Sequence, residues 1–485
     1  MLLTLVAVYL LITIAIGLVA ARRVKNTADF AIAGRNLPLV MIITTTFATW
    51  FGSETVLGIP AKFIDGGLGA VVEDPFGAGT CLILVGLFFA GKLYRMTLLT
   101  ISDYYRERYG RVVEVACSLI IMLSYLGWVS AQVTALGLVF NLLSGGSLSI
   151  PWGMTIGVLS ILVYTLWGGM WSVAVTDFIQ MIILVLGLVI LSWFAADMAG
   201  GAGKVVDLIT SRDMLRFWPE PTWHEVLFFF GAAITMMLGS IPQQDVFQRV
   251  MSANTEKAAT HGTVIGGSAY ILFAFVPMFL VASALLIMPE QAAELLQEDP
   301  QKVLPTLVMT RMPLVMQVLF FGALLSAIKS CASATLLAPS VTFTENIWRQ
   351  FRPEHISDRE KLLTMRISVL VFAAGVLVYS IKMEGTPIYE LVSSAYQVPL
   401  VGAFVPLVFG LYWSRATTQG ALLAVALGLG TWLLFLSSPV LSGAFPQQLA
   451  GLLAALVGML AGSLVPQFVP DHKGHVHHYE GSVAA

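Results

Sequence analysis

The stretch FATWFGSETVLGIP, residues 47–60, decides how this chain folds. It lies in a long apolar run, yet it contains Gly52, Ser53, Glu54, Gly58 and Pro60, which weaken a helix or carry charge. Inside hydrocarbon, unpaired backbone groups are costly, and an ionised side chain costs about 2.5 kcal/mol or more. Irregular backbone is tolerated at that depth only where protein buries it or where it lines a wet cavity. The stretch therefore predicts a broken membrane helix inside the protein.

Composition places the rest of the chain in a membrane as well. Of the 485 residues, 57% are hydrophobic and 11% are charged, and the mean hydropathy is +0.84, which ordinary soluble domains do not reach. Runs long enough to cross about 30 Å of hydrocarbon recur near residues 2–21, 38–58, 70–92, 112–143, 151–168, 177–197, 224–247, 262–288, 314–344, 364–382, 388–413, 417–437 and 446–467. We expect an all-α polytopic membrane protein with about thirteen transmembrane helices.

A second interrupted stretch, LGSIPQQDVFQRV at 238–250, contains Gly239, Ser240 and Pro242. The two interrupted stretches fall in the second and seventh spans, five spans apart. Paired breaks in two halves are typical of transporters with an inverted repeat, in which unwound backbone binds ions and substrate. Two ordinary kinked helices would leave a similar pattern, because Gly and Pro are common in membrane spans. The acids Glu54 and Asp245 at the breaks favour a binding site.

The basic residues predict the orientation. An odd number of spans puts the termini on opposite sides, and an external N-terminus places 18 of the 26 Lys and Arg residues, Arg249 among them, in inner loops. This agrees with the excess of positive charge on cytoplasmic loops. We therefore expect an integral, multi-pass protein of a bacterial inner membrane, with the N-terminus outside and the C-terminus in the cytoplasm.

Several function classes lack support in the sequence. No basic patch interleaved with aromatic residues indicates nucleic-acid binding. The spans hold no His/Cys/Asp cluster at metal spacing and no Ser/His pair, so neither an enzyme nor an organic cofactor is expected. A transporter-like membrane sensor is an alternative of another class. The expected partners are a small-molecule solute and the lipid bilayer, and the oligomeric state is left open.

The ninth span carries polar residues on one face. Ser326, Lys329, Ser330 and Ser333 follow the spacing i, i+3, i+4 and i+7. A face that holds hydroxyls and an ammonium belongs in the interior of a helix bundle, where hydroxyl oxygens ligate a hard cation or bond to neighbouring helices. This span is therefore a candidate ion site.

Three motifs, VYTLWGGMWSVAVTDFIQ at 163–180, VFQRV at 246–250 and FTENIW at 343–348, resemble the sodium:solute symporter family in their order and in their spans. ATWFG at 48–52 and GSIPQQDVFQRV at 239–250 are most similar to its high-affinity choline transporter branch. The resemblance implies a leucine-transporter-type core of five plus five inverted helices, with sodium-coupled uptake by alternating access.

This resemblance also implies a division of the chain. Residues 1–37 would form an extra helix and an inner loop, 38–223 the first repeat and 224–415 the second. Residues 416–467 would add two C-terminal helices, and 468–485 would form a polar cytoplasmic tail.

The family's sodium site implies particular ligands in this chain. They are the carbonyls of Ala48, Phe51 and Ala327 with the side chains of Ser330 and Cys331, while Asp177 and Ser333 correspond to an additional sodium site. Cys331 departs from the family, whose members have a second hydroxyl there, and a thiol is a poor partner for a hard cation. Lys329 also departs, because relatives carry an apolar residue at this position.

The choline branch implies a substrate pocket in which Trp50 and Trp128 enclose a quaternary ammonium group through cation–π attraction. Its third aromatic is replaced by Gln243. The expected substrate-binding residues are Trp50, Glu54, Thr55, Trp128, Gln243, Gln244 and Asp245. Such a pocket suits a choline-like amine, an amino acid or another zwitterion, although Trp128 has a packing role as its alternative.

Coupling has two alternatives. In the first, sodium drives uptake and Lys329 pairs with Glu54, Asp245 or Asp177 in a structural role. In the second, the ammonium of Lys329 replaces the sodium ion, so that transport is coupled to protons or is uncoupled.

Overall fold

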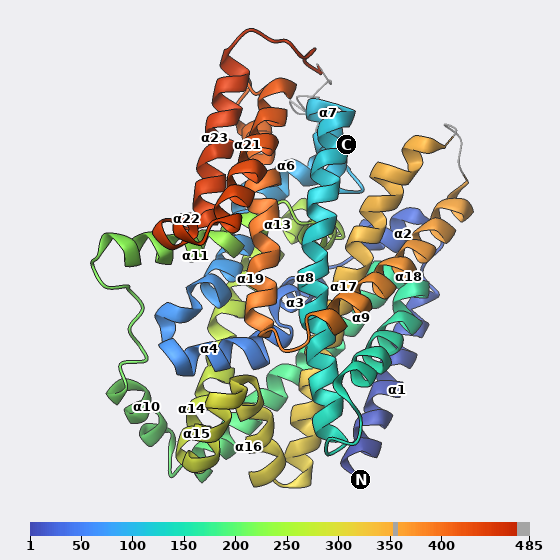
Figure 1. Cartoon of the computed structure of the whole chain (residues 1–485). Coiled ribbons are helices and arrows are strands. Elements are labelled where there is room, and N and C mark those ends of the chain that lie inside the picture. The colour runs from blue at the N-terminus through green and yellow to red at the C-terminus, as the bar shows by residue number, and fades with distance from the viewer. Residues whose placement is uncertain (353–356, 473–485) are drawn as a thin grey trace.

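The computed structural model describes residues 1–352 and 357–472 (Figure 1). The described part is built from helices, with one isolated bridge between Leu37 and Ala253. Lys473 and the rest of the expected tail beyond residue 472 lie outside the described residues.

The α-helices are α1 (Leu2–Ala21), α2 (Thr27–Ile32), α3 (Leu39–Trp50), α4 (Ile59–Gly66), α5 (Ala78–Leu84), α6 (Ala90–Arg95), α7 (Ile101–Tyr109), α8 (Arg111–Leu143), α9 (Ile150–Met198), α10 (Ala202–Ser211), α11 (Trp223–Gly239), α12 (Gln244–Met251), α13 (Glu256–Phe273), α14 (Phe275–Ile287), α15 (Pro289–Glu298), α16 (Val303–Arg311), α17 (Leu314–Thr342), α18 (Asp358–Lys382), α19 (Ile388–Pro399), α20 (Val405–Tyr412), α21 (Thr418–Ser437), α22 (Pro439–Ala444) and α23 (Gln447–Leu464). Short 3-10 turns are η1 (Ala33–Arg35), η3 (Leu68–Val71), η6 (Pro300–Lys302) and η8 (Trp348–Phe351). Wider π-helical turns are η2 (Glu54–Gly58), η4 (Val72–Gly77), η5 (Val85–Phe89), η7 (Phe343–Ile347) and η9 (Leu400–Phe404).

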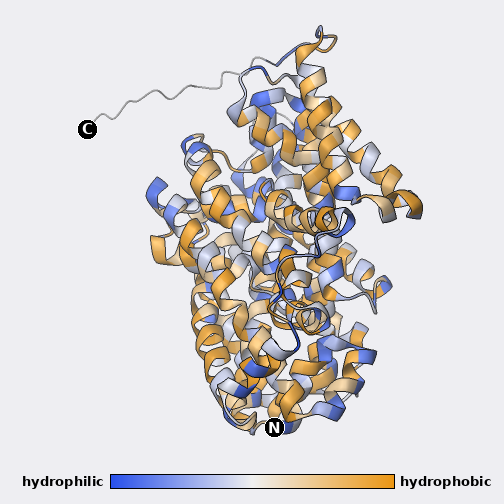
Figure 2. Ribbon diagram, turned by 90° about the vertical axis from the view of Figure 1, so that its left-hand side faces the viewer, coloured by the Kyte–Doolittle hydropathy of each residue, from blue (hydrophilic) through white to orange (hydrophobic). Residues whose placement is uncertain are grey.

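The expected spans are confirmed. In the described part, ten helical segments are long and apolar enough to cross a membrane, and the bent pair α11 and α12 makes an eleventh. The 49-residue α9 holds two of the expected spans, because its backbone leaves helical geometry at Gly169 (φ 46°, ψ −140°). The helices α3 and α4, on either side of a break, form the remaining span. Most of the helical ribbon is apolar (Figure 2).

The helix α17 forms the centre of the bundle. Every residue from Phe320 to Thr342 is buried, and α17 packs against α1, α3, α8, α9, α12 and α18. A helix that is buried on all sides belongs inside a large bundle. The polar face of the ninth span therefore faces protein, as its pattern predicted.

The first break interrupts the backbone ladder of the second span, which confirms that prediction. The helix α3 ends at Trp50, and Phe51 adopts φ −79° and ψ 73°. The Trp50 carbonyl accepts from the amide of Gly52 at 2.8 Å and from the hydroxyl of Thr55 at 2.7 Å. Protein buries residues 48–59 throughout, so other groups satisfy the backbone that the helix has released.

The second break separates α11 from α12, whose axes differ by 46°. A Cβ added at Gly239 would lie 2.4 Å from the carbonyl oxygen of Tyr396. Glycine therefore lets α19 approach the end of α11 closely. The helix α12 packs against α3, so the two interrupted spans adjoin each other.

A third interruption, between α4 and α5, was not predicted. Gly67 has a φ of 67°, and Asp74 leaves helical geometry inside η4 with φ −142° and ψ 120°. The acids Glu73 and Asp74 in this segment are 5% and 1% exposed. They fall at the start of the expected span 70–92, at the edge of the membrane, whereas the fold draws them into the interior.

Candidate functional site

Asp177 of α9 joins three helices. Its Oδ2 accepts from the hydroxyl of Thr45 in α3 at 2.7 Å, and its Oδ1 accepts from the hydroxyl of Ser330 in α17 at 2.5 Å. All three side chains are buried. One carboxylate and two hydroxyls are hard oxygen ligands of the kind that alkali and alkaline-earth cations prefer.

The contacts of Asp177 with Thr45 and Ser330 form a polar seam between α3, α9 and α17. The remaining expected sodium ligands come from α17 and from the C-terminal end of α3. Cys331 donates its thiol to the carbonyl of Thr49 at 3.1 Å, directly beside Ala48. Phe51 and Ala327 are fully buried. Ser333 donates to the Ser330 carbonyl at 3.0 Å. The seam supplies oxygens that fit a sodium ion, while the thiol does not.

Sequence reasoning missed Thr45. It precedes Ala48 by three residues, so the two lie on the same face of α3. The three-residue spacing from Ala48 was the feature of the sequence that could have identified Thr45. The Thr45 hydroxyl brings α3 into contact with Asp177, which links the two sodium sites implied by the sequence into one polar seam.

Lys329 points away from the seam. Its Nζ donates to the Thr13 hydroxyl of α1 at 2.9 Å and lies 5.3 Å from the centre of the Tyr164 ring. The side chain is 1% exposed, and among the described residues no carboxylate lies within 4 Å of its Nζ. The expected pairing with Glu54, Asp245 or Asp177 is therefore not found. Lys329 instead contacts the extra N-terminal helix.

Three aromatic rings meet where α3, α8 and α19 converge. The ring centres are 5.1 Å apart for Trp50 and Trp128, 5.5 Å for Trp50 and Tyr396, and 4.9 Å for Trp128 and Tyr396, all edge to face. None is more than 1% exposed. The indole nitrogens and the Tyr396 hydroxyl have no hydrogen-bond partner in the described part of the chain. We call these three residues the aromatic triad.

Tyr396 thus supplies the third aromatic ring that the sequence lacked at Gln243. No motif marked it, because it comes from α19, far from both broken stretches. Gln243 lies close to the triad, since its Nε2 donates at 2.8 Å to Ser124, one helical turn before Trp128. Its Oε1 and the Ser240 hydroxyl have no partner among the described residues.

Asp245 is engaged within the protein. Its Oδ1 accepts from the Tyr125 hydroxyl at 2.6 Å, and its Oδ2 lies 3.4 Å from Nη1 of Arg249. Arg249 is fully buried in α12, so counting it as an inner-loop residue was wrong. Its Nε and Nη2 have no partner in the described part. Gln244 turns elsewhere, and its Oε1 accepts from the amide of Ile101.

Glu54 and Thr55 belong to a separate set of polar contacts. Glu54 Oε2 accepts from Nε2 of Gln132 at 2.7 Å. The Thr55 hydroxyl lies 3.0 Å from the hydroxyl of Tyr270, which donates to Oδ1 of Asp74 at 2.5 Å. The carboxylate of Asp74 is thereby joined to the first break through two hydrogen bonds.

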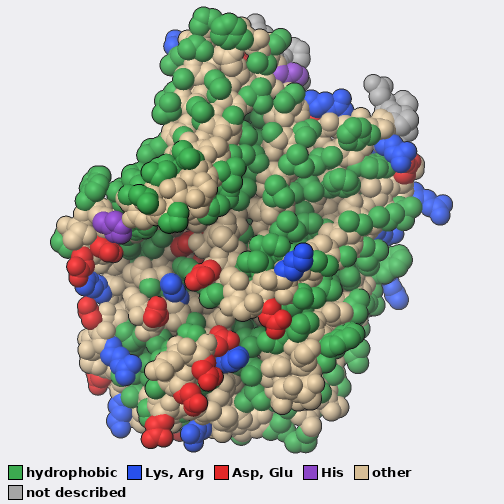
Figure 3. Space-filling view, in the orientation of Figure 1, with side chains coloured by type: hydrophobic (Ala, Val, Ile, Leu, Met, Phe, Trp, Pro, Cys, Tyr) green, Lys and Arg blue, Asp and Glu red, His purple; other side chains and the backbone are tan. Residues whose placement is uncertain are grey.

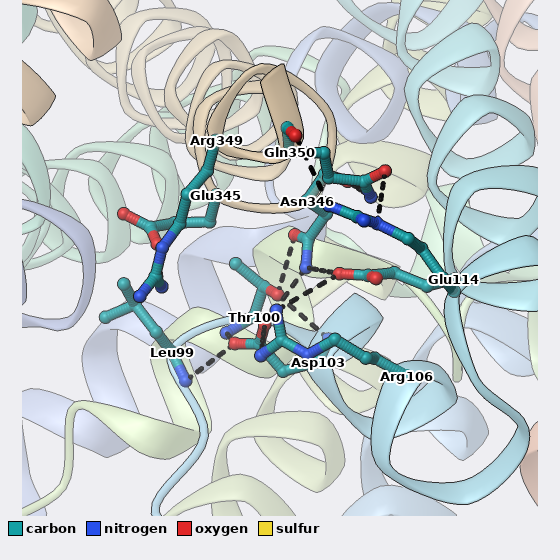
Figure 4. Close-up of polar contacts among 10 residues, drawn as sticks. Leu99, Thr100, Asp103, Arg106, Glu114, Glu345, Asn346, Arg349 and Gln350 are labelled. Carbon is teal, nitrogen blue, oxygen red and sulfur yellow. Dashed lines mark hydrogen bonds and ion pairs between the residues drawn. The ribbon is translucent and has the colours of Figure 1, made fainter. Parts of the chain in front are cut away.

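A polar network lies at the predicted inner side of the molecule (Figure 4). Asn346, from the FTENIW motif, donates to Asp103 at 3.0 Å and to Glu114 at 2.9 Å, and its Oδ1 accepts from Thr100. Arg106 lies 3.0 Å from Asp103 and 3.4 Å from Glu114. The network fastens the end of α17 to α7 and the start of α8, so the motif has a structural role at this end.

Comparisons with known proteins show which family the chain matches. The model of the sodium:solute symporter family matches residues 30–428. The high affinity choline transporter 1 of Homo sapiens is 26% identical over 453 residues, covering 87% of this chain and 75% of the relative. The high-affinity proline transporter PutP of Bacillus subtilis is 25% identical over 466 residues, covering 93% and 95%.

Solved structures resemble the fold. A Na+-coupled sialic acid symporter in a substrate-bound outward-open state has a TM-score of 0.82 at 18% identity, covering 95% of this chain and 97% of that chain. Mhp1, a nucleobase-cation-symport-1 family transporter, has a TM-score of 0.59 at 15% identity, covering 90% and 95%. These likenesses confirm the leucine-transporter-type fold. The match to the family model indicates a transporter rather than an enzyme.

Proposed function

Because this chain belongs to the sodium:solute symporter family, we propose that it couples sodium entry to the uptake of a small organic amine whose cationic group binds at the aromatic triad. Family membership itself supports secondary active symport of a small-molecule solute. The choice of an amine depends on one observation, the contact of Trp50, Trp128 and Tyr396 at ring-centre distances of 4.9 to 5.5 Å.

The chemistry of the aromatic triad supports this choice. The face of an aromatic ring attracts a cation, with about 0.5 to 2 kcal/mol per contact as the ring becomes desolvated. The three rings lie beside both helix breaks, and movement of α3 would separate Trp50 from the other two rings. Unpartnered polar atoms on each ring and on Gln243 provide hydrogen bonds for a hydroxyl or amino group of the solute.

The proposed sodium site is the seam around Asp177. Asp177, Thr45 and Ser330 contribute oxygens from three helices. A cation at this point would bridge α3 of the first half to α17 of the second. Its binding would thus favour one arrangement of the two halves, which is how an ion biases a conformational equilibrium.

A zwitterion is the second candidate, and Arg249 favours it. Two of the guanidinium nitrogens of this buried side chain have no partner in the described part of the chain. A carboxylate would bind such a group in a charge-assisted hydrogen bond. In that case the solute is an amino acid, and Arg249 would exchange contact with Asp245 for contact with the solute.

Counterflow in proteoliposomes tests both candidates. Choline and proline are loaded inside, and the entry of each labelled solute is measured with sodium or potassium outside. We expect sodium-dependent entry of labelled choline that is weakened in Trp50→Ala. Entry of proline alone, weakened in Arg249→Gln, would support the zwitterion. Entry that does not respond to sodium would contradict the proposed coupling.

A further inference from the structure

Three buried carboxyl groups belong to two segments that hydrogen bonds join, the first break and the π-helical turn η4 between α4 and α5. Glu54, Glu73 and Asp74 are 0%, 5% and 1% exposed. Each uses one oxygen, since Glu54 accepts from Gln132, Glu73 from Ser393 at 2.8 Å and Asp74 from Tyr270. The second oxygen of each has no partner among the described residues. We call these three residues the acidic cluster.

The acidic cluster lacks a neighbouring positive charge. Among the described residues, no Lys, Arg or His nitrogen lies within 4 Å of its carboxyl oxygens. Asp245 differs, because Arg249 lies beside it. An unpaired carboxylate removed from water is strongly destabilised, and a bound cation relieves that penalty.

An open cavity reaches towards the acidic cluster from the predicted outer side. It has a volume of about 520 Å³, and Gly58 and Tyr389 belong to its lining. Its charged lining residues are Asp65, Glu298, Asp299, Glu384 and Glu390 against Lys62 and Lys302. In Figure 3 the acidic side chains gather on the lower half of the visible face, where α15 and α16 lie. A cavity with this charge attracts cations.

Two residues connect the cavity to the acidic cluster. Gly58 follows Glu54 by about one helical turn in η2. Tyr389 also lines the cavity, and its buried hydroxyl lies near Glu73 and Asp74. The lining of the cavity therefore includes a residue that lies beside two of the carboxyl groups.

We infer that Glu54 and Asp74, with the hydroxyls of Tyr270 and Thr55, form a second cation site that is separate from the Asp177 seam and is filled from this cavity. Its ligand is a monovalent cation, either a sodium ion or the ammonium group of the solute. No three His, Cys, Asp or Glu side chains of the described residues converge on one metal position, which disfavours a divalent cage. The inference rests on the proposed function only if the bound cation is the ammonium group of the solute.

Binding measurements on the purified full-length chain distinguish the two sources. Equilibrium binding of radioactive sodium and of labelled choline is measured for wild type, Glu54→Gln and Asp74→Asn. Asp177→Asn serves as the comparison for the other site, and Glu290→Gln is an exposed carboxyl control on α15. Size-exclusion chromatography identifies the variants that remain folded.

If the site takes sodium, Glu54→Gln and Asp74→Asn each remove about one bound ion per chain. This ion is a different one from the ion that Asp177→Asn removes. If it takes ammonium, both variants weaken choline binding about tenfold or more and leave sodium binding unchanged. A wild type that binds no choline contradicts the proposed amine, while the sodium measurement still decides the site. Folded variants that retain both binding activities overturn the second site.

A measurement on a chain with both carboxyls intact covers the case in which these variants do not fold. A hydrophobic carbodiimide reacts with buried carboxyl groups, and mass spectrometry locates the products. In the Asp177→Asn background, we expect sodium or choline to slow the modification of Glu54 and Asp74 at least severalfold. Equal modification with and without both cations would also overturn the inference.

Discussion

Two sets of buried carboxyl groups differ in their partners. Asp177 has a hydroxyl on each oxygen, and Asp245 has Tyr125 on one and Arg249 on the other. Glu54 and Asp74 each keep one oxygen without a partner among the described residues. The protein interior thus holds carboxylates with partners on both oxygens and carboxylates with a partner on only one oxygen.

This difference separates two ways of using a buried charge. Around Asp177 the fold fixes the oxygens from three helices in advance, so an ion that enters finds its ligands in place. At Glu54 and Asp74, the second oxygen of each carboxyl group is available to a ligand that the protein does not supply. Satisfied polar groups rigidify a core, whereas unsatisfied ones indicate a missing partner.

The largest effect is expected at Asp177, whose two carboxylate oxygens both have hydroxyl partners. Asp177→Asn removes the charge and keeps the side-chain shape, so Thr45 and Ser330 retain one acceptor. A unit charge about 4 Å from a cation is worth about 4 kcal/mol at an effective dielectric constant near 20, and sodium affinity should fall by about tenfold or more. The sodium dependence of initial uptake measures this change.

Asp197→Asn is the matched control, because Asp197 lies exposed near the end of the same helix. It should leave the sodium dependence unchanged. Equal sodium affinity in Asp177→Asn and wild type would show that the seam is structural, and would leave the acidic cluster as the stronger candidate for the coupling ion.

The second prediction concerns Trp50, which lies four residues before Glu54 in the chain. Trp50→Ala removes the ring that contacts both Trp128 and Tyr396, and should weaken binding of a cationic solute by about 1 kcal/mol or more. Titration of labelled choline measures the change, and Trp193→Ala, on an exposed part of α9, is the control.

Asp245→Asn refines this test. A loss that is much larger for cationic than for neutral solutes would place the Asp245 charge in the binding site. Equal losses for both classes would mean that its contacts with Tyr125 and Arg249 are its whole role.

The sequence predicted the breaks because their cause is local. Gly52 and Ser53 at one site and Gly239, Ser240 and Pro242 at the other weaken a helix wherever they occur in a long apolar span. The polar face of α17 was equally visible, because helical spacing alone places Ser326 and Ser330 together.

The rest depended on contacts between distant segments. Tyr396 completes the aromatic triad only because α19 packs against Gly239, and Arg249 looks like a loop residue until α12 buries it beside Asp245. Asp74 was placed near the end of a span, since no local pattern shows that Tyr270 will hold it next to the first break. Tertiary packing, rather than propensity, sets these positions.

The third prediction concerns Cys331, which follows the Asp177 partner Ser330 in α17. Cys331 places a thiol beside the carbonyl of Thr49, where a hydroxyl would be a harder ligand for sodium. Cys331→Ser should therefore raise sodium affinity by about threefold, worth about 0.65 kcal/mol, and sharpen its saturable dependence. Sodium titration of counterflow measures the shift. A weaker sodium dependence would mean that the Thr49 contact, rather than the ion, uses this side chain.

The smallest effect is expected at Lys329. Its Nζ meets one hydroxyl and one ring, on the side of α17 that faces α1. Lys329→Met keeps the length of the side chain and removes a buried charge that has no carboxylate within 4 Å in the described part of the chain. Thr13 keeps a partner, since its hydroxyl already donates to the Leu10 carbonyl at 2.8 Å.

We therefore expect Lys329→Met to change the sodium dependence of uptake by less than about twofold. Its thermal stability should stay within about 1 kcal/mol of wild type, because a lost cation–π contact and a removed desolvation cost offset each other. Uptake at several pH values, with sodium or potassium, is the decisive measurement. Sodium-independent, pH-dependent uptake in wild type that disappears in Lys329→Met would make the ammonium of Lys329 the coupling charge, and both carboxyl sets would then lose their assigned ions.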